Sequence, residues 1–164
     1  MRIVIFGANG PTGRLLTRLS LTAGYDTVAV TRQPGAFGLQ DPRLRVTGAD
    51  VLDADAVDGV VTGSDAVLSA LGVPFGKTPV EVYSRSDADW TILRPSGLYE
   101  LPEVTDYSLT GEHGPGRFTA RIDLADAIVR QVTDDRFVRR TGHVITTRDN
   151  PSLLSMMLRE AFGK

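Results

Sequence analysis

The chain has 164 residues, of which 41% are hydrophobic and 23% are charged, and its formal net charge is −2. These values predict a single soluble domain that covers residues 1–164 and has one hydrophobic core. Because cysteine is absent, disulfides, thiolate metal ligands and cysteine nucleophiles are excluded. The sequence has no metal-ligand motif, basic excess, signal peptide or apolar run of about 20 residues. We therefore expect a cytoplasmic protein without a metal, nucleic-acid or membrane partner.

The first residues of the chain predict a phosphate-binding turn. An apolar run at 2–6 leads through a glycine-rich stretch into a segment with helical periodicity at 12–23. That order of strand, glycine-rich turn and helix is the setting in which such glycines indicate nucleotide binding. Gly7 would allow a sharp turn, Gly10 would let a pyrophosphate approach the backbone, and Gly13 would let the helix pack closely on the sheet.

The spacing of these glycines is Gly-x-x-Gly-x-x-Gly, whereas most dehydrogenases have Gly-x-Gly-x-x-Gly. An ordinary strand-to-helix turn is the alternative. Pro11 suits the first turn of a helix, because its missing N–H would have no intrahelical partner there. The unpaired N–H groups of a helix start and the positive end of its dipole favour phosphate. The stretch therefore predicts a dinucleotide site.

The end of the predicted strand at 27–30 bears on the choice of cofactor. NAD enzymes usually carry an acidic residue here, about 20 residues beyond the glycine loop, to hold the ribose 2′-hydroxyl. This chain has Thr31 and Arg32 instead. A guanidinium pairs well with a 2′-phosphate, so we expect NADP(H) to be preferred over NAD(H). The alternative is that Arg32 is a solvated charge in a surface loop.

Strands and helices are expected to alternate along the chain. Three β-α-β units in succession predict an α/β fold with a doubly wound parallel sheet. We expect the strand order 3-2-1-4, followed by the strands at 90–94 and 142–147, and an irregular stretch over 95–117. The predicted strands cover 2–6, 27–30, 43–48, 64–70, 90–94 and 142–147, and the predicted helices cover 12–23, 54–61, 78–86, 121–129 and a segment from Asn150 onward.

Several acidic residues allow more than one interpretation. Asp50 follows a predicted strand, where its carboxylate could accept a hydrogen bond from an adenine amino group or from its own turn. Asp53 is expected to cap the helix that follows. Asp106, Asp123 and Asp126 are expected to be turn or helix-surface charges.

The sequence leaves the catalytic residues open. Ser96 and Tyr99 follow the strand at 90–94, so either could face a substrate. His113 lies in a glycine-rich loop that could cover a substrate, and its ordinary pKa suits proton transfer, although a lone loop histidine is more often plain surface. His143 opens a predicted strand and is expected to be structural. The Tyr-x-x-x-Lys pair of classical short-chain dehydrogenases is absent.

Six stretches of sequence, spread over nearly the whole chain, form a specific set. They are residues 5–13, 30–32, 48–53, 65–72, 89–95 and 121–125. Together they resemble the atypical short-chain dehydrogenase/reductase group in its NmrA-like branch, and within it the biliverdin IXβ reductase/flavin reductase type. The resemblance implies a Rossmann fold that binds NADP(H) and either reduces small planar substrates or acts as a redox-sensing binder.

The resemblance also implies a role for individual residues. Arg32 would bind the 2′-phosphate, while Asp50 and Val51 would flank the adenine. The nicotinamide half would lie near Pro95 and near three residues that end the fourth strand. The pyrophosphate would be held by the glycine loop. The three residues at the end of the fourth strand are Ala70, Leu71 and Gly72. The residues of the glycine loop are Gly7, Asn9, Gly10, Pro11, Thr12 and Gly13.

The chain departs from this family in its centre. The family pattern places a long helix, a fifth strand ending in serines and another helix between Gly72 and Trp90, and this sequence is too short there to hold them. A β-α-β crossover needs only about a dozen residues, so the strand at 90–94 could take the vacated place. We therefore expect a shortened Rossmann-like sheet, which a second copy of the chain could cover as a homodimer.

The expected function is hydride transfer from NADPH to a small planar acceptor such as a flavin, a quinone or a tetrapyrrole. Such a reaction needs few catalytic side chains, because the cofactor carries the chemistry and the protein supplies orientation. The alternative is a module that binds NAD(P) without turnover, either as a redox sensor or as a shortened reductase.

Overall fold

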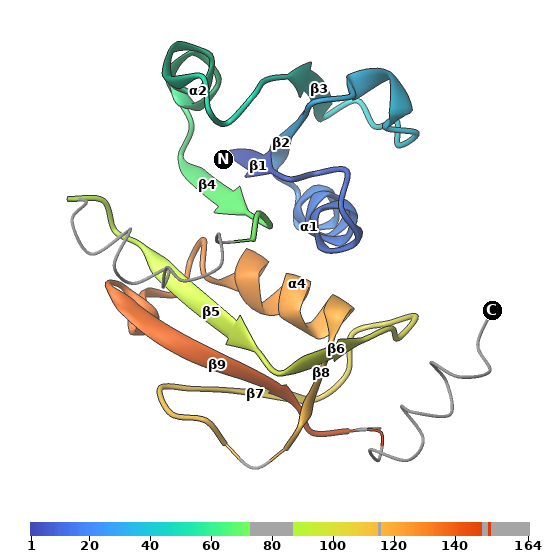
Figure 1. The fold of residues 1–164 in the computed structure, drawn as a ribbon, viewed down its shortest axis with the longest axis vertical. Coiled ribbons are helices and arrows are strands. Elements are labelled where there is room, and N and C mark those ends of the chain that lie inside the picture. The colour runs from blue at the N-terminus through green and yellow to red at the C-terminus, as the bar shows by residue number, and fades with distance from the viewer. Residues whose placement is uncertain (73–86, 115, 149–150, 152–164) are drawn as a thin grey trace.

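The computed structural model describes residues 1–72, 87–114, 116–148 and 151 (Figure 1). Its first half is a sheet of four parallel strands in the order β3-β2-β1-β4, which confirms the expected order of these strands. The elements are β1 (Arg2–Phe6), α1 (Pro11–Thr22), β2 (Asp26–Thr31), a 3₁₀ turn η1 (Pro34–Ala36), β3 (Leu44–Gly48), α2 (Ala54–Val61) and β4 (Ala66–Ser69).

Helices cover both faces of this sheet, because successive strand residues point to opposite sides. Ile3 and Ile5 of β1 pack with Leu16 of α1 on one face. Val4 and Phe6 pack toward α2 on the other face. These four residues of β1 are all buried, as expected for a parallel strand covered on both sides. The sheet is therefore doubly wound, as predicted.

The second half of the chain forms two smaller sheets. β9 lies between β5, which is parallel to it, and β7, which is antiparallel, while β6 and β8 form a parallel pair. The elements are β5 (Thr91–Pro95), β6 (Gly97–Tyr99), β7 (Tyr107–Thr110), β8 (Phe118–Ala120), α4 (Arg121–Arg130), a 3₁₀ turn η2 (Asp135–Phe137) and β9 (Arg140–Thr146).

Two expectations about this half are wrong. The expected pairing of β5 with the last strand is present, but within the described residues β5 has no ladder with β4, so the sheet is not continuous. The stretch 95–117 is not irregular, because it contains β6 and β7. These strands have only three and four residues, which is too short for an alternating pattern to distinguish them from loop.

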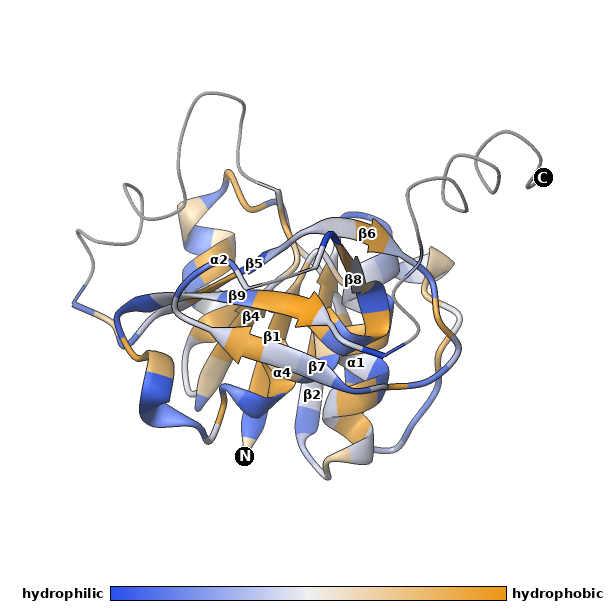
Figure 2. Ribbon diagram, turned by 90° about the horizontal axis from the view of Figure 1, so that it is seen from below, coloured by the Kyte–Doolittle hydropathy of each residue, from blue (hydrophilic) through white to orange (hydrophobic). Residues whose placement is uncertain are grey.

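Helix α4 joins the two halves (Figure 1). Ala125 and Val129 pack with the core of the first sheet, whereas Leu124 and Ala127 pack with Val144 of β9. Hydrophobic residues of β1, β9 and α4 accordingly lie toward the middle of the molecule (Figure 2). The β5-β9-β7 sheet is therefore anchored on α4, and within the described residues it has no ladder with β4.

The ends of the helices show local causes. Asp53 caps α2 as expected, since its Oδ1 accepts a hydrogen bond from the N–H of Ala56 at 3.1 Å. Gly24 follows α1 with φ of +88°, a conformation that favours glycine after a helix. The helices expected at 78–86 and from Asn150 lie outside the described residues. Within the described ranges, no helix has the length and apolar character that a membrane span requires.

Candidate functional site

The glycine loop connects β1 to α1, and its three glycines differ in how far the surrounding protein requires them. Gly7 has φ of +73° and makes the turn. A Cβ on Gly13 would lie 2.1 Å from the carbonyl oxygen of Gly7 and 2.7 Å from Cα of Ala8, so α1 packs too closely on the loop for any side chain. A Cβ on Gly10 would meet its nearest protein atom at 3.4 Å, an ordinary contact. The described protein atoms therefore require glycine at 7 and 13 but leave space at 10.

The start of α1 is open toward this loop. Gly10 occupies the N-cap position and offers no side-chain cap, and no acidic residue stands in the first turn. Pro11 lies in the first turn, as predicted. A helix start without a capping side chain keeps N–H groups and the positive end of its dipole available to an anion.

Asn9 is held at the tip of the loop by Arg14, whose role was not expected from the sequence. Oδ1 of Asn9 accepts a hydrogen bond from Nη2 of Arg14 at 2.7 Å, and Nδ2 of Asn9 donates to the carbonyl oxygen of Gln33 at 3.4 Å. The Arg14 guanidinium also lies 5.5 Å from the centre of the Phe37 ring, a cation–π distance. Arg14 thereby connects α1, the glycine loop and the segment that follows β2.

Arg32 lies next to the glycine loop, at the end of the neighbouring strand. β2 pairs with β1, and the N–H of Ala8 donates to the carbonyl oxygen of Val30 at 3.3 Å. The Arg32 side chain is exposed, and the described residues provide it with no hydrogen bond or ion pair. Its guanidinium is therefore free to bind a ligand at this edge of the sheet.

The predicted adenine residues follow β3. Oδ1 of Asp50 accepts a hydrogen bond from the N–H of Leu52 at 3.0 Å, which is the turn role that the sequence left open. An adenine contact of Asp50 stays a prediction. Val51 and Leu52 are both exposed apolar side chains, and the predicted contact of Val51 with the adenine also stays a prediction.

The end of β4 lies against the glycine loop, whereas the end of β5 belongs to the other sheet. A Cβ on Gly7 would come within 3.2 Å of Cδ2 of Leu71, and the N–H of Ala70 donates to the carbonyl oxygen of Phe6 at 3.0 Å. Apart from its chain neighbours, no atom of the described residues lies within 4 Å of the Cβ position of Gly72. Pro95 pairs with Val144 of β9, in the other sheet. The structure thus places Arg32 and residues 70–72 at the ends of strands that flank the loop strand β1, whereas Pro95 lies in the other sheet. The predicted position of Pro95 near the nicotinamide stays a prediction.

Two of the three catalytic candidates contact each other. Oγ of Ser96 lies 3.0 Å from Nε2 of His113, and Nδ1 of His113 lies 2.9 Å from the carbonyl oxygen of Gly114. When Nδ1–H donates to that carbonyl, Nε2 accepts the hydroxyl proton of Ser96. The ring of His143 lies 5.6 Å from that of His113. Tyr99 is only 5% exposed in an apolar cluster, which argues against a catalytic role.

The backbone around Ser96 limits the chemistry of this pair. The N–H of Ser96 donates to Oγ1 of Thr119 at 3.0 Å, and the N–H of Gly97 donates to the carbonyl oxygen of Arg117 at 3.2 Å. Acyl transfer needs N–H groups that are free to bind an oxyanion beside the nucleophile. Because both neighbouring N–H groups are occupied, the pair is suited to moving a proton and not to nucleophilic attack.

The expectation that Asp123 is a surface charge is wrong. Asp123 is fully buried, and its carboxylate accepts hydrogen bonds from the N–H and the hydroxyl of Thr105 and from the hydroxyl of Thr146. The helical pattern suggested a surface position because it cannot show which neighbouring loop supplies donors. Asp106 has an exposed side chain, as expected, whereas Asp126 is largely covered and bonded by Tyr107 and Arg130.

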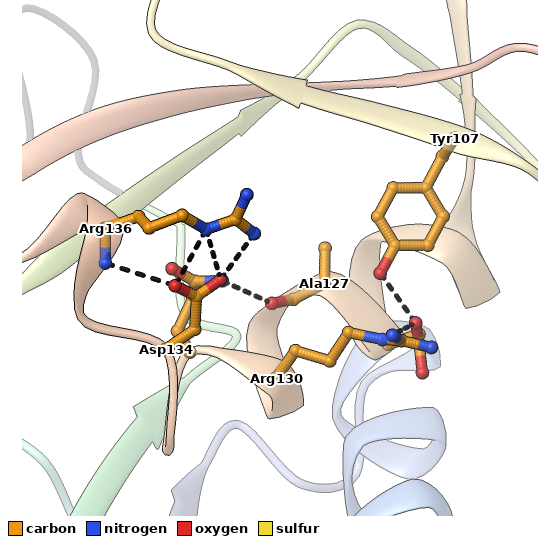
Figure 3. Close-up of polar contacts among 7 residues, drawn as sticks. Tyr107, Ala127, Arg130, Asp134 and Arg136 are labelled. Atoms are coloured by element: carbon orange, nitrogen blue, oxygen red, sulfur yellow. Dashed lines mark hydrogen bonds and ion pairs between the residues drawn. The ribbon is translucent and has the colours of Figure 1, made fainter.

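A hollow of about 380 Å³ opens at the end of α4. Figure 3 shows the polar contacts of Tyr107, Arg130 and Arg136 in this region. Tyr107, Arg130 and Arg136 contribute to its wall. Both arginines are paired with carboxylates at 2.7 Å, Arg130 with Asp126 and Arg136 with Asp134. The bonds from Arg136 lower the pKa of Asp134 to about 2. Among the described residues, the lining of the hollow therefore contains neither a glycine nor an unpaired arginine.

From the environment of Tyr107 we expect the protein to lose stability in alkaline solution. Burial and the 2.6 Å hydrogen bond to Asp126 raise its pKa above the ordinary value of 10.0. Below about pH 10 the contacts of neutral Tyr107 therefore stabilise the folded protein in full. As the pH rises further, Tyr107 ionises in the unfolded chain before it does in the folded protein, so this contribution to stability is lost. Tyr107→Phe should cost about 1–2 kcal/mol at neutral pH, and this cost should shrink above about pH 10.

The measurement is urea denaturation across this range, with Tyr25→Phe as the matched control. No side-chain hydrogen bond of Tyr25 is recorded in the described part of the chain. A cost of Tyr107→Phe that stays constant with pH would contradict the assignment.

The chain matches a known protein family. The model of the NAD(P)H-binding family matches residues 7–82 and 77–135, so two matched segments cover most of the chain. The two segments overlap at 77–82, in the region where the sequence lacks the central elements of the family pattern.

Solved structures share the fold at low sequence identity. A wide-type short-chain dehydrogenase/reductase from Veillonella parvula, solved in complex with NADP, is 19% identical with a TM-score of 0.77, over 92% of this chain and 96% of that one. ChuY, an anaerobillin reductase from Escherichia coli O157:H7, is 18% identical with a TM-score of 0.73, over 93% of this chain and 100% of that one. A Rossmann-fold NAD(P)-binding protein from Shigella flexneri is 19% identical with a TM-score of 0.75, over 93% and 96%. These likenesses show a Rossmann fold.

Proposed function

The chain belongs to the NAD(P)H-binding family, and on that premise we propose that it is an NADPH-dependent reductase of the biliverdin IXβ reductase/flavin reductase type. It transfers hydride to a small planar acceptor such as a flavin, a quinone or a tetrapyrrole. The observation that carries the proposal is the glycine loop. Its middle glycine leaves space that the described protein atoms do not fill, in front of a helix start without a side-chain cap.

The preference for NADP(H) rests on Arg32. Its guanidinium is exposed and free of protein partners within the described ranges, beside the loop that holds the pyrophosphate. A bidentate contact to the 2′-phosphate would exist with NADPH and not with NADH. The similar Veillonella parvula protein was solved in complex with NADP, which supports this preference.

Arg32→Ala should therefore weaken NADPH binding about tenfold to a hundredfold, the usual range for a charge-assisted contact, and leave NADH binding within about twofold. Titration of both nucleotides, followed by their fluorescence, measures the two affinities. Arg45→Ala is the matched control, because Arg45 is an exposed arginine on the neighbouring strand β3. Equal losses of NADPH and NADH would contradict the role of Arg32.

Proton delivery to the acceptor is assigned to Ser96 and His113. An oxidised flavin or quinone takes up a proton as well as a hydride when it is reduced. A protonated His113 can pass its Nε2 proton to Ser96 while the hydroxyl proton of Ser96 moves to the acceptor. The bond between Nδ1 and the carbonyl oxygen of Gly114 orients the ring for this transfer.

Turnover is tested by following the loss of NADPH absorbance with FMN or a soluble quinone as acceptor. We expect oxidation above the background rate, and a rate about tenfold lower in His113→Gln, with unchanged NADPH affinity. Tight binding without oxidation would reject the reductase and support the second candidate, a module that binds NADP(H) without turnover. The break between β4 and β5 favours that candidate, because the family strand that borders the nicotinamide would lie there. No binding at millimolar NADPH would reject both.

A homodimer that covers the shortened sheet and a cytoplasmic location stay predictions. Sedimentation or light scattering measures the oligomeric state directly. We place the site within one copy of the chain, since β1, β2 and β4 supply the loop, Arg32 and residues 70–72.

A further inference from the structure

Arg121, the first residue of α4, reaches from the second half of the chain to the glycine loop. Its Nη1 donates a hydrogen bond to Oγ1 of Thr12 at 3.2 Å, and its Nε donates to Oε1 of Glu100 at 2.6 Å. The Arg121 side chain is 21% exposed, whereas that of Glu100 is 67% exposed. Thr12 is the second residue of α1. A partly buried cation from α4 therefore lies at the helix start where phosphate is expected.

The contact determines how the Thr12 hydroxyl can act. Oγ1 accepts a hydrogen bond from Arg121, so the hydroxyl proton is left to donate to another group. A guanidinium carries five N–H donors, and the bonds to Thr12 and Glu100 use Nη1 and Nε. Within the described residues no bond of Nη2 is recorded. An O–H donor and a guanidinium N–H donor thus lie side by side, which suits an anion with several oxygen atoms.

The charges around Arg121 also favour an anion. The first turn of α1 contains no acidic residue, and neither Gly10 nor Ala120, the N-cap residues of α1 and α4, provides a side-chain cap. Asp123, in the first turn of α4, is fully buried and bonded by threonines. The carboxylate of Glu100 pairs with Arg121 by accepting a hydrogen bond from Nε. It does not occupy Nη2.

We infer that Arg121 is a second phosphate-binding cation, which binds the pyrophosphate of the dinucleotide together with the hydroxyl of Thr12. Glu100 holds the guanidinium in place through Nε, while the Nη atoms face Thr12 and the pyrophosphate. The inference rests on the proposed function, since it requires a dinucleotide in the loop. It assigns to Arg121 a role distinct from that of Arg32, because the pyrophosphate is common to NADPH and NADH, whereas only NADPH carries the 2′-phosphate.

The test is to titrate NADPH and NADH separately into the wild type, Arg121→Gln, Arg121→Lys and Arg130→Gln. Arg121→Gln should weaken both nucleotides by the same factor, about tenfold to a hundredfold, and should reduce the dependence of binding on salt. Arg121→Lys keeps the charge but not the planar fork, so it should recover part of the loss. Arg130→Gln is the matched control, because Arg130 lies at the other end of α4 and also pairs with a carboxylate.

A second variant keeps the inference testable should Arg121→Gln fail to fold. Thr12→Val removes the oriented hydroxyl and should weaken both nucleotides several-fold, whereas Thr12→Ser should bind as the wild type does. The inference is overturned when Arg121→Gln and Thr12→Val bind both nucleotides within about twofold of the wild type. It is also overturned when the loss is confined to NADPH or is equalled in Arg130→Gln. A wild type that binds neither nucleotide is a different result, and it rejects the proposed function as well.

Discussion

Gly13→Ala should destabilise the protein by about 3 kcal/mol or more, and Gly10→Ala should leave the stability within about 1 kcal/mol of the wild type. The same methyl group is added in both variants. At position 13 it would lie 2.1 Å from the carbonyl oxygen of Gly7 and 2.7 Å from Cα of Ala8. These are backbone atoms of the loop, so relief requires α1 to move away from β1 and from the core that Leu16 shares with Ile3 and Ile5.

The affinity for NADPH should be affected by Gly10→Ala, although this variant keeps its stability. Gly10→Ala should fold and weaken NADPH binding at least about tenfold, because its methyl group occupies the space through which a pyrophosphate approaches the backbone. Urea denaturation measures the stability of both variants, and nucleotide fluorescence measures the affinity of Gly10→Ala. A Gly10→Ala variant that binds NADPH normally would exclude the loop as the pyrophosphate site. An undiminished stability of Gly13→Ala would contradict the close packing of α1.

Asp123→Ala should cost about 3 kcal/mol or more of the free energy of unfolding. The carboxylate is fully buried and accepts hydrogen bonds from the N–H of Thr105 at 2.8 Å, its hydroxyl at 2.9 Å and the hydroxyl of Thr146 at 2.6 Å. Oγ1 of Thr146 accepts in turn from the N–H of Ala120 at 2.7 Å. Truncation leaves buried donors without an acceptor, and each such donor costs about 1–3 kcal/mol.

The matched control for this variant is Asp55→Ala. Asp55 also stands in the first turn of a helix, α2, but it is exposed. Its loss should therefore cost less than about 1 kcal/mol, the usual value of a charge at a helix start. Thermal or urea denaturation of both variants provides the comparison. Similar costs for the two aspartates would show that burial of Asp123 contributes little.

Local signals were sufficient to predict the first half of the fold. The apolar run of β1, the glycines of the loop and the cap Asp53 act within a few residues of one another, and the structure has the elements where the pattern placed them. The glycine loop, Arg32 and residues 70–72 follow neighbouring parallel strands, whose carboxyl ends lie at one edge of the sheet. Their binding of a cofactor stays a prediction.

Long-range contacts explain what the sequence could not predict. The helical periodicity of α4 identified an apolar face, but Asp123 is buried because Thr105 and Thr146 supply its donors from other elements. The contact of Arg121 with Thr12 spans 109 positions, and no local pattern indicates it. β6, β7 and β8 have three or four residues each and are defined by their partners.

The closed hydrogen-bond pattern of the first sheet has an evolutionary consequence. Within the described chain, every ladder of β1, β2, β3 and β4 ends on another member of this group. The strand pairing of this sheet is thus complete within the first half of the chain, and the second half is joined to it through α4, by side-chain packing and by the hydrogen bond from Arg121 to Thr12. Insertions or deletions between β4 and β5 can therefore remodel the acceptor side without breaking a strand ladder of the sheet that carries the glycine loop.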